Sequence, residues 1–551
     1  MIATRREFIG GAAALALGGQ ASGAWAAPAS PAMAAALAAI GAHAQEHLRH
    51  FALPALTLSL TAPGGFATQM DFGHADPAER RRADASTLFQ IGSISKVMTA
   101  VAIHQLAAEG RLRLGGDVRA VLPEAPLPQG VPITVQQLLD HVSGLPADAP
   151  AFPDGERLWT GFAPGQHWSY SNTGYTLLGL IAERIERRPL AQILHARLFA
   201  PLGMTRTRGA IVGADRARFA IGYGALDGDG PLLRGAALAP APWVEVTFGA
   251  GSVASTASDM VLFMRSLFDA AQGRGGLGLD PERARAFVGH DVATEDQAMR
   301  YGNGLMKRVA DGRALLHHTG GMVAFSSSFH LDPADGTGAF ASASIGFPAN
   351  YRPRALTLFA VQALQAAREG RTLPRAPSLH VPIPGAAYAG RYEGPGGGFE
   401  IKGADPVILA GGREAPLQMV DEDALGTLHP QLAAWPLRFI RRDGRVVAAG
   451  WGPETFVRQG TGYVPPASDP QLALLAGRYV SDSPWSGVAR VAERSGQLWL
   501  GGVAPLTRLG VGLWRIGDKA WSPERARFAN PVGGRPQTLL LSGDKFDRRD
   551  I

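Results

Sequence analysis

The sequence predicts an α+β protein in which a large unit of helices and strands is followed by two small antiparallel β-barrel-like domains. Three observations support this fold class. Helical and strand patterns are mixed up to about residue 370, short strand-like runs separated by glycine then continue to the end, and this last part contains an internal repeat. The chain has 551 residues. Single hydrophobic cores stop growing at roughly 250–300 residues, so several domains are expected.

Composition excludes several classes of protein. Hydrophobic residues make up 46% and charged residues 18% of the chain, which is an ordinary globular balance. The absence of cysteine excludes a disulfide framework, a thiol nucleophile and cysteine-ligated metal sites. The net charge of +6 is mild for this length, so nucleic acid is not an expected partner. No three histidines have metal-ligand spacing, and we expect no metal and no cofactor.

Residues 1–26 have the features of a Tat-type export signal. Arg5-Arg6 forms a twin-arginine pattern, a weakly apolar stretch covers 8–17, and Ala24-Trp25-Ala26 offers the small residues that a signal peptidase reads. The apolar stretch is shorter than the roughly 20 residues that span a bilayer. We therefore expect a periplasmic or secreted protein with no integral membrane segment in its mature chain.

Local patterns predict the elements of the first unit. Residues 56–61 alternate apolar and polar side chains, which predicts a half-buried strand. The segment 93–109 lacks proline and glycine and has little polar surface, which predicts a helix buried on most sides and ended by Gly110. Further helical patterns cover 135–141, 173–187 and 258–268, and Thr256 could cap the last of these.

Two proline-rich breaks divide the rest of the chain, near 374–384 and 465–470. We place the first unit at 27–370 and the two β-domains at 385–462 and 471–551. The segments 389–392, 415–417, 438–439 and 456–458 recur in order at 476–479, 504–506, 527–528 and 546–548, at offsets of 87 to 90 residues. A nearly constant offset indicates duplication, and strands punctuated by glycine favour antiparallel barrels.

The strongest chemical pattern is Ser93-x-x-Lys96 at the start of the buried helix. A spacing of three places both side chains on one helix face. A serine hydroxyl needs a neighbouring base to act as a nucleophile, and burial in an apolar helix disfavours the lysine ammonium. The alternative is an ordinary helix start with a surface lysine.

A second pattern, Tyr170-x-Asn172, precedes a predicted helix. A tyrosine near a lysine can relay protons between nucleophile and leaving group. An asparagine amide can hold a substrate carbonyl. The alternative is that this segment only caps the helix and packs a loop.

A third pattern, His318-Thr319-Gly320-Gly321, lies in a segment that suits a strand. A strand edge with small residues can pair with an extended substrate, and its amide can complete an oxyanion hole. The alternative is a structural histidine, with the adjacent His317 as the outward-facing one.

Together the three patterns resemble the motifs of the serine β-lactamase and penicillin-binding-protein superfamily. Residues 133–146 also resemble a signature of its class C-like branch. The resemblance covers about residues 45–365 and implies a β-lactamase-like catalytic domain, an antiparallel sheet flanked by helices beside a helical region. The duplicated β-domains resemble the three-domain layout of D-stereospecific aminopeptidases.

Two departures from the family patterns bear on activity. His318 stands where many members carry lysine, which resembles some DD-peptidases, D-aminopeptidases and esterases more than dedicated β-lactamases. No Glu-x-x-Leu-Asn segment is present, so the class A deacylation route is not supported.

The resemblance also implies roles for the site residues. Ser93 would be the acylated nucleophile, Lys96 its base or proton shuttle, and Tyr170 the general acid and base for the leaving group and the deacylating water. The amides of Ser93 and Gly321 would form the oxyanion hole. The substrate-binding residues would be Asn172, His318, Thr319, Gly320 and Gly321.

We therefore expect an exported serine acyl hydrolase that works through a Ser93 acyl-enzyme. Its substrate would be a small molecule or peptide, for example one derived from the cell wall: a D-amino-acid peptide, a β-lactam or a short ester. The alternative is a non-catalytic member of the same fold whose β-domains bind the cell wall or another protein.

Overall fold

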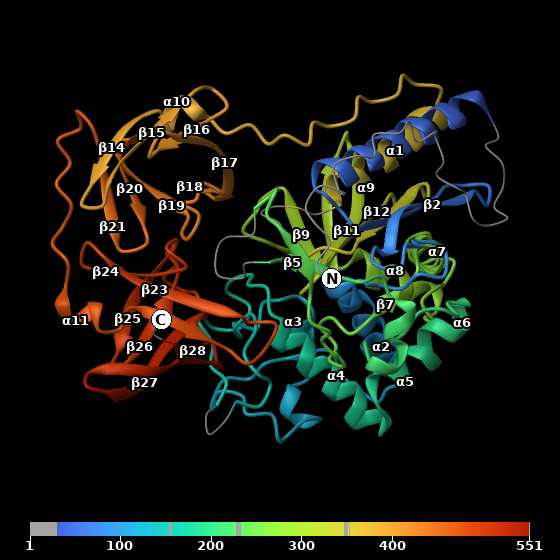
Figure 1. The fold of residues 1–551 in the computed structure, drawn as a ribbon. Helices are drawn as coiled ribbons and strands as arrows, with labels where there is room; N and C mark the ends of the chain where they lie inside the picture. Colours follow the sequence, from blue (N-terminus) through green and yellow to red (C-terminus); the bar gives the residue numbers. More distant parts are fainter. Residues whose placement is uncertain (1–29, 154–156, 227–232, 347–350, 352, 550–551) are drawn as a thin grey trace.

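The computed structural model describes residues 30–153, 157–226, 233–346, 351 and 353–549 of the chain. They form a unit of sheet and helices followed by two closed β-barrels (Figure 1). The predicted α+β class with two antiparallel barrels is confirmed. The predicted export signal, residues 1–26, lies outside the described residues. Within the described part of the chain, none of the helices has the length and hydropathy needed to cross a membrane.

A nine-stranded antiparallel sheet forms the centre of the first unit, in the order β3-β2-β1-β13-β12-β11-β10-β9-β8. The strands are β1 (Ala55–Thr61), β2 (Ala67–Asp76), β3 (Arg81–Arg82), β8 (Val292–Ala293), β9 (Met299–Gly302), β10 (Leu305–Ala310), β11 (Arg313–Met322), β12 (Phe325–Leu331) and β13 (Gly338–Ala343). Helices α1 (Pro31–His50) and α9 (Arg354–Arg368) cover one face (Figure 1). Helices α2 (Ser95–Ala108) and α7 (Ala257–Ala271) pack on the other.

Strand β1 corrects one prediction. The alternating pattern predicted a half-buried strand, but all seven residues of β1 are buried. The reason is its central place in a sheet that has helices on both faces. Two of its polar side chains are satisfied internally: the Thr57 hydroxyl donates to Asp71 Oδ1 at 2.6 Å, and the Thr61 hydroxyl donates to the Phe66 carbonyl at 3.2 Å.

A helical region lies beside the sheet and contains most of the segment between the first two chemical patterns. The remaining helical elements of the unit are η1 (Gly92–Ile94), η2 (Val118–Ala120), α3 (Val135–Leu139), α4 (Asn172–Glu186), α5 (Leu190–Leu194), η3 (His195–Phe199), α6 (Ala200–Leu202), η4 (Gly213–Arg218) and α8 (Pro281–Gly289). Two small strand pairs complete the unit: β4 (Phe89–Gln90) with β7 (Ala254–Ser255), and β5 (Tyr223–Ala225) with β6 (Leu238–Pro240).

Polar caps determine where two of these helices begin. Ser171 Oγ accepts a hydrogen bond from Gly174 N at 3.0 Å, at the start of α4. Thr256 Oγ1 accepts from Asp259 N at 3.3 Å at the start of α7, as the capping pattern predicted. The helix predicted from residue 93 begins as the 3₁₀ turn η1 and continues as α2.

Both barrels consist of eight antiparallel strands in sequential order. The first contains β14 (Gly390–Gly394), β15 (Gly397–Lys402), β16 (Val407–Ala410), β17 (Arg413–Asp421), β18 (Ala424–Thr427), β19 (Leu437–Arg442), β20 (Arg445–Trp451) and β21 (Glu454–Arg458), after α10 (Gly385–Tyr388). The second contains β22 (Gly477–Val480), β23 (Val488–Arg494), β24 (Gln497–Leu500), β25 (Ala504–Gly510), β26 (Leu513–Ile516), β27 (Arg525–Val532), β28 (Arg535–Leu541) and β29 (Asp544–Arg548), after α11 (Pro470–Ala473).

The repeated residues have equivalent places in the two barrels. Tyr392 pairs with Arg458, and Tyr479 with Arg548, across the seam that closes each barrel. The Tyr392 hydroxyl donates to the backbone carbonyl four residues earlier at 2.6 Å, and the Tyr479 hydroxyl does the same at 2.8 Å. Each tyrosine thus ties the first strand of its barrel to the turn before it.

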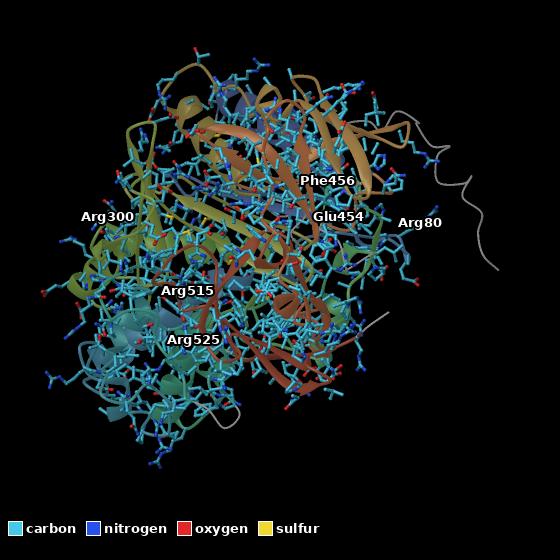
Figure 2. The ribbon with its side chains drawn as sticks, turned by 90° about the vertical axis from the view of Figure 1, so that its left-hand side faces the viewer. Arg80, Arg300, Glu454, Phe456, Arg515 and Arg525 are labelled. Atoms are coloured by element: carbon cyan, nitrogen blue, oxygen red, sulfur yellow. The ribbon has the colours of Figure 1, made fainter. Side chains whose placement is uncertain are left out.

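The barrels lie next to each other on one side of the first unit (Figure 1). Figure 2 shows the first barrel, marked by Phe456, above the second, marked by Arg515. Arg494 of the second barrel is 2% exposed and donates through Nη1 to the Gly452 carbonyl of the first at 2.8 Å. A guanidinium can satisfy several acceptors at once, which suits a buried contact between two barrels.

Candidate active site

Ser93 and Lys96 meet at the junction of η1 and α2. Lys96 Nζ lies 3.0 Å from Ser93 Oγ. The helical spacing brings the two groups together, as the pattern predicted. Lys96 is completely buried, so its amine reaches the serine without contact with bulk water.

Two further acceptors fix the Lys96 amine. Nζ donates to Asn172 Oδ1 at 2.6 Å and to the Ala250 carbonyl at 2.8 Å. Both oxygens can only accept, whereas the serine hydroxyl can also donate. A neutral amine therefore satisfies the site with two N–H donors and directs its lone pair at Ser93 Oγ.

Burial lowers the pKa of Lys96 from its usual 10.5 to about 7, because an ammonium is disfavoured away from water. The negative charge of Asp148 opposes this shift. The neutral amine is therefore well populated near pH 7, as a general base requires.

Tyr170 lies beside this pair. Lys96 Nζ is 4.9 Å from the centre of the Tyr170 ring. Burial raises the pKa of Tyr170 well above its usual 10, and the interaction of its hydroxyl with Ser93 opposes the rise. The phenol therefore stays protonated at neutral pH. Burial thus lowers the pKa of Lys96 and raises that of Tyr170. At neutral pH Lys96 can therefore act as the base and Tyr170 as the acid.

Asn172 is the first residue of α4, and both ends of its amide are engaged. Its Oδ1 faces Lys96, and its Nδ2 donates to Asp148 Oδ1 at 2.6 Å. These contacts make Asn172 a bridge between the lysine and a carboxylate, and its role as a substrate ligand stays a prediction. Asp148 has no pattern of its own in the sequence, and only the fold reveals it.

His318 faces the site from β11, and its neighbour His317 faces the opposite side of the sheet. The His318 ring centre is 6.5 Å from that of Tyr170, whereas His317 stacks on His330 at 5.0 Å. Successive residues of a strand point to opposite faces, which explains the difference. The structure therefore selects His318 of the two candidates.

The His318 imidazole is held in a neutral form. Nδ1 donates to the Thr319 carbonyl at 2.7 Å, which leaves Nε2 to accept from the Tyr301 hydroxyl at 3.4 Å. Burial is the main cause that lowers the pKa of His318 to about 3, and Lys96 adds to this shift when its amine is protonated. His318 thus supplies no positive charge at pH 7, unlike the lysine found at this position in many family members.

Glycines allow β11 to approach the nucleophile closely. Gly92 has a φ of +53°, and a Cβ there would lie 2.7 Å from Gly321 N. A Cβ on Gly320 would overlap the Ile91 carbonyl oxygen. The backbone of Gly321 therefore lies beside the peptide that precedes Ser93, where an oxyanion hole needs it.

An aromatic cluster supports Tyr170. The His141 ring is centred 4.3 Å from Tyr170, 5.1 Å from Tyr175 and 4.7 Å from Tyr301. His141 Nδ1 accepts from Ser171 N at 3.1 Å, which ties this ring to the backbone after Tyr170. Tyr301 was not predicted, because it lies on a distant strand without a motif.

The second barrel docks on the loop that leads from His141 to Tyr170 (Figure 1). Glu524 Oε1 accepts from Ala147 N at 2.7 Å, and the Ala147 carbonyl accepts from Asn172 N at 2.7 Å. Trp521 stacks on His167 at 4.9 Å with an interplanar angle of 10°. Two hydrogen bonds of Ala147, one to Glu524 and one to Asn172, thus connect the barrel to the active site. No sequence pattern indicated this connection.

Within the part of the chain that the structure describes, no group of three or more histidine and acidic side chains is arranged to hold a metal ion.

An antiparallel sheet flanked by helices, with a serine and a buried lysine at the start of a central helix, defines the β-lactamase-like class of proteins. The sequence agrees with this class, since residues 4–363 match the Beta-lactamase family. The match covers more than half of the chain, and the chain belongs to that family.

Two curated relatives match part of the chain. A penicillin-binding protein of Bacillus subtilis (strain 168) is 34% identical over 168 residues, which are 27% of this chain and 37% of that protein. Protein flp of Staphylococcus aureus (strain N315) is 29% identical over 198 residues, which are 33% of this chain and 40% of that protein. The matched region spans less than half the length of either relative.

Two solved structures share the fold. The octameric penicillin-binding protein homologue from Pyrococcus abyssi has a TM-score of 0.54 and 22% identity, covering 77% of this chain and 100% of that one. The D-amino acid amidase from Ochrobactrum anthropi SV3 has a TM-score of 0.51 and 25% identity, covering 62% and 99%. The first likeness, at this identity, concerns the fold alone.

We predict that Glu524 acts as a positioning residue for the site. Glu524→Ala removes the acceptor of the partly buried Ala147 N–H, a loss that costs up to about 1–3 kcal/mol for a buried donor, and loosens the loop bound to Asn172. We expect kcat to fall about tenfold while Ser93 still reacts with an acylating probe. Steady-state kinetics of this variant and wild type measure the effect.

Glu454→Ala is the matched control, because Glu454 accepts from a backbone N–H (Gly396) in the first barrel. Glu524→Gln keeps an acceptor oxygen and should retain most of kcat. Equal kcat in wild type and Glu524→Ala would show that the docking contact does not position the site.

Proposed function

We propose that this chain is an exported serine acyl hydrolase that forms an acyl-enzyme at Ser93 and cleaves amides or esters. The observation that carries the proposal is the surroundings of Lys96 Nζ: two fixed acceptors, and Ser93 Oγ at 3.0 Å. Few structural roles would justify a buried lysine with a lowered pKa next to a serine, whereas nucleophilic catalysis requires that combination.

In the proposed acylation step, neutral Lys96 accepts the Ser93 hydroxyl proton as Oγ attacks the substrate carbonyl carbon. The N–H groups of Ser93 and Gly321 stabilise the resulting oxyanion. Collapse of the tetrahedral intermediate breaks the bond to the leaving group, which takes a proton from the Tyr170 hydroxyl. The proton held by Lys96 then restores Tyr170.

Deacylation repeats these steps with water in place of the serine. Water gives a proton to the Lys96 and Tyr170 pair and attacks the acyl carbon, and Ser93 Oγ leaves with a proton. Asn172 keeps Lys96 oriented in both halves of the reaction, through its 2.6 Å hydrogen bond.

The neutral His318 favours substrates without a carboxylate next to the scissile bond. β-Lactams and D-Ala-D-Ala peptides carry such a carboxylate, which a cationic side chain binds more strongly than a neutral one. His318 has a pKa lowered to about 3 and cannot provide that charge at pH 7. A place for His318 in the proton network is therefore favoured over contact with a substrate carboxylate, and amides and esters of D-amino acids are the favoured substrates. The likeness to a D-amino acid amidase supports this class.

Export through the twin-arginine route is part of the proposal and rests on the Arg5-Arg6 pattern. Replacing both arginines by lysine should leave the unprocessed chain inside the cell, because the export machinery reads the guanidinium pair. Cell fractionation followed by immunoblotting measures this outcome. Normal processing and release of the double variant would argue against this route.

Ser93→Ala should abolish turnover of amide and ester substrates, by at least about a thousandfold in kcat, because removing a nucleophile leaves only binding and oxyanion stabilisation. A fluorophosphonate adduct should appear at Ser93 by intact mass in wild type only. Ser86→Ala, an exposed serine outside the site, is the control. Undiminished hydrolysis by Ser93→Ala, or saturable wall binding without any turnover, would favour the non-catalytic alternative.

The rate of acylation should rise with pH through a midpoint near 7, because the neutral form of Lys96 is the base and its pKa is about 7. The measurement is the second-order rate of fluorophosphonate labelling between about pH 5 and 9. Asp148→Asn should move the midpoint to lower pH, since the Asp148 charge raises the pKa of Lys96. A midpoint near 10 would contradict the assignment of Lys96 as a neutral base.

A further inference from the structure

Two aromatic side chains from different domains face each other beside the active site. Phe248 precedes the Ala250 carbonyl that holds Lys96, and Trp485 lies in the loop between β22 and β23 of the second barrel. Their ring centres are 6.5 Å apart, at an interplanar angle of 56°. Phe248 is 38% exposed and Trp485 is 41% exposed, so an open apolar surface remains on both.

The backbone connects Phe248 to the nucleophile. Gly251 N donates to the Phe248 carbonyl at 3.2 Å, which closes a tight turn. A Cβ on Gly251 would lie 3.9 Å from the Phe248 ring and 4.0 Å from the carbonyl carbon of Gly92. That carbon is bonded to the nitrogen of Ser93, so the Phe248 ring lies about one side chain's width from the peptide that bears the nucleophile.

The Trp485 loop approaches the same space from the barrel. The hydroxyl of the next residue, Ser486, donates to Asp544 Oδ2 at 2.8 Å. Burial, with a further contribution from the negative charge of Asp148, raises the pKa of Asp544. Asp148 in turn accepts from Asn172 Nδ2. The loop that carries Trp485 therefore lies next to the residues that surround the catalytic lysine.

Other contacts also dock the barrel on the first unit. Trp521 already stacks on His167, and Trp159 Nε1 donates to the Pro523 carbonyl at 2.6 Å. These contacts are closer than that between Phe248 and Trp485 and come from another loop of the barrel. The open pair is therefore available for a ligand.

We propose that Phe248 and Trp485 form a subsite for an apolar group of the substrate, so that the second barrel makes the enzyme select hydrophobic amides and esters. The inference rests on the proposed acyl hydrolase function and specifies its substrate class. An aromatic or branched aliphatic group placed against both rings loses contact with water and gains contact with two flat faces.

The test compares substrates that differ only in an apolar group. In one series the acyl part of a p-nitrophenyl ester changes from acetyl to phenylacetyl, and in the other the alcohol of an acetate ester changes from methanol to benzyl alcohol. For each series the readout is the ratio of kcat/KM for the larger substrate to that for the smaller. Wild type, Phe248→Ala, Trp485→Ala, Trp485→Phe and Trp521→Ala are compared.

We expect Phe248→Ala and Trp485→Ala to lower this ratio about tenfold in at least one series, since hydrophobic pockets discriminate by roughly this amount for small apolar groups. Trp485→Phe should restore most of the ratio. Trp521→Ala weakens docking and should leave the ratio unchanged, whatever it does to the absolute rate.

An unchanged ratio in both series for both alanine variants would overturn the subsite. Such a result leaves the proposed function standing if wild type still forms the Ser93 adduct and turns over the smaller esters. Absence of that adduct and of turnover in wild type would instead refute the acyl hydrolase itself.

Discussion

The burial of the Lys96 amine is the constraint on which the rest of the site depends. An ammonium in this position would be costly, and burial accordingly lowers the pKa of the group to about 7. A neutral amine needs two acceptors for its protons, which Asn172 and Ala250 supply from segments far apart in the sequence. Both segments are themselves held firmly, the first by the N-cap of α4 and the second by a turn closed at Phe248.

The side chains of β11 alternate between the two faces of the sheet, and this alternation determines which histidine enters the site. The surroundings on that face determine its protonation state. His318 lies on the face that carries Tyr170, and His317 on the face that packs against other parts of the core. The same strand ends in glycines, which let its backbone approach Gly92. One strand therefore supplies both the neutral imidazole and the close backbone contact.

The sequence could predict the fold class and the group formed by Ser93, Lys96 and Tyr170, because each belongs to a short pattern with a physical reason. The carbonyl of Ala250 could not be predicted, since any residue type has one and only the fold selects it. Asp148 and Tyr301 carry no motif. The alternating pattern of β1 led to the wrong prediction of a half-buried strand, because alternation of residue types does not show whether one or both faces of a sheet are covered.

The duplication explains how a barrel came to reach the active site. In each barrel the loop between the fifth and sixth strands docks on the next body. In the first barrel this loop presents Trp435, which Arg490 of the second barrel covers at 5.5 Å while donating to the Ala434 carbonyl at 2.8 Å. In the second barrel the equivalent loop presents Trp521 and Glu524 to the first unit.

The barrels therefore support each other, and the first barrel also contacts the first unit directly, since Gln418 exchanges two 2.9 Å hydrogen bonds with the backbone of Arg234. The first barrel holds the second, and the second holds the loop that contains Ala147 and Asp148. Because each barrel uses the loop between its fifth and sixth strands for docking, the two docking contacts differ mainly in the surface that this loop meets. In this arrangement residues more than 350 positions after Asn172 influence the same lysine as Asn172 itself, because Glu524 and Asn172 bind the same residue, Ala147, through its two backbone groups.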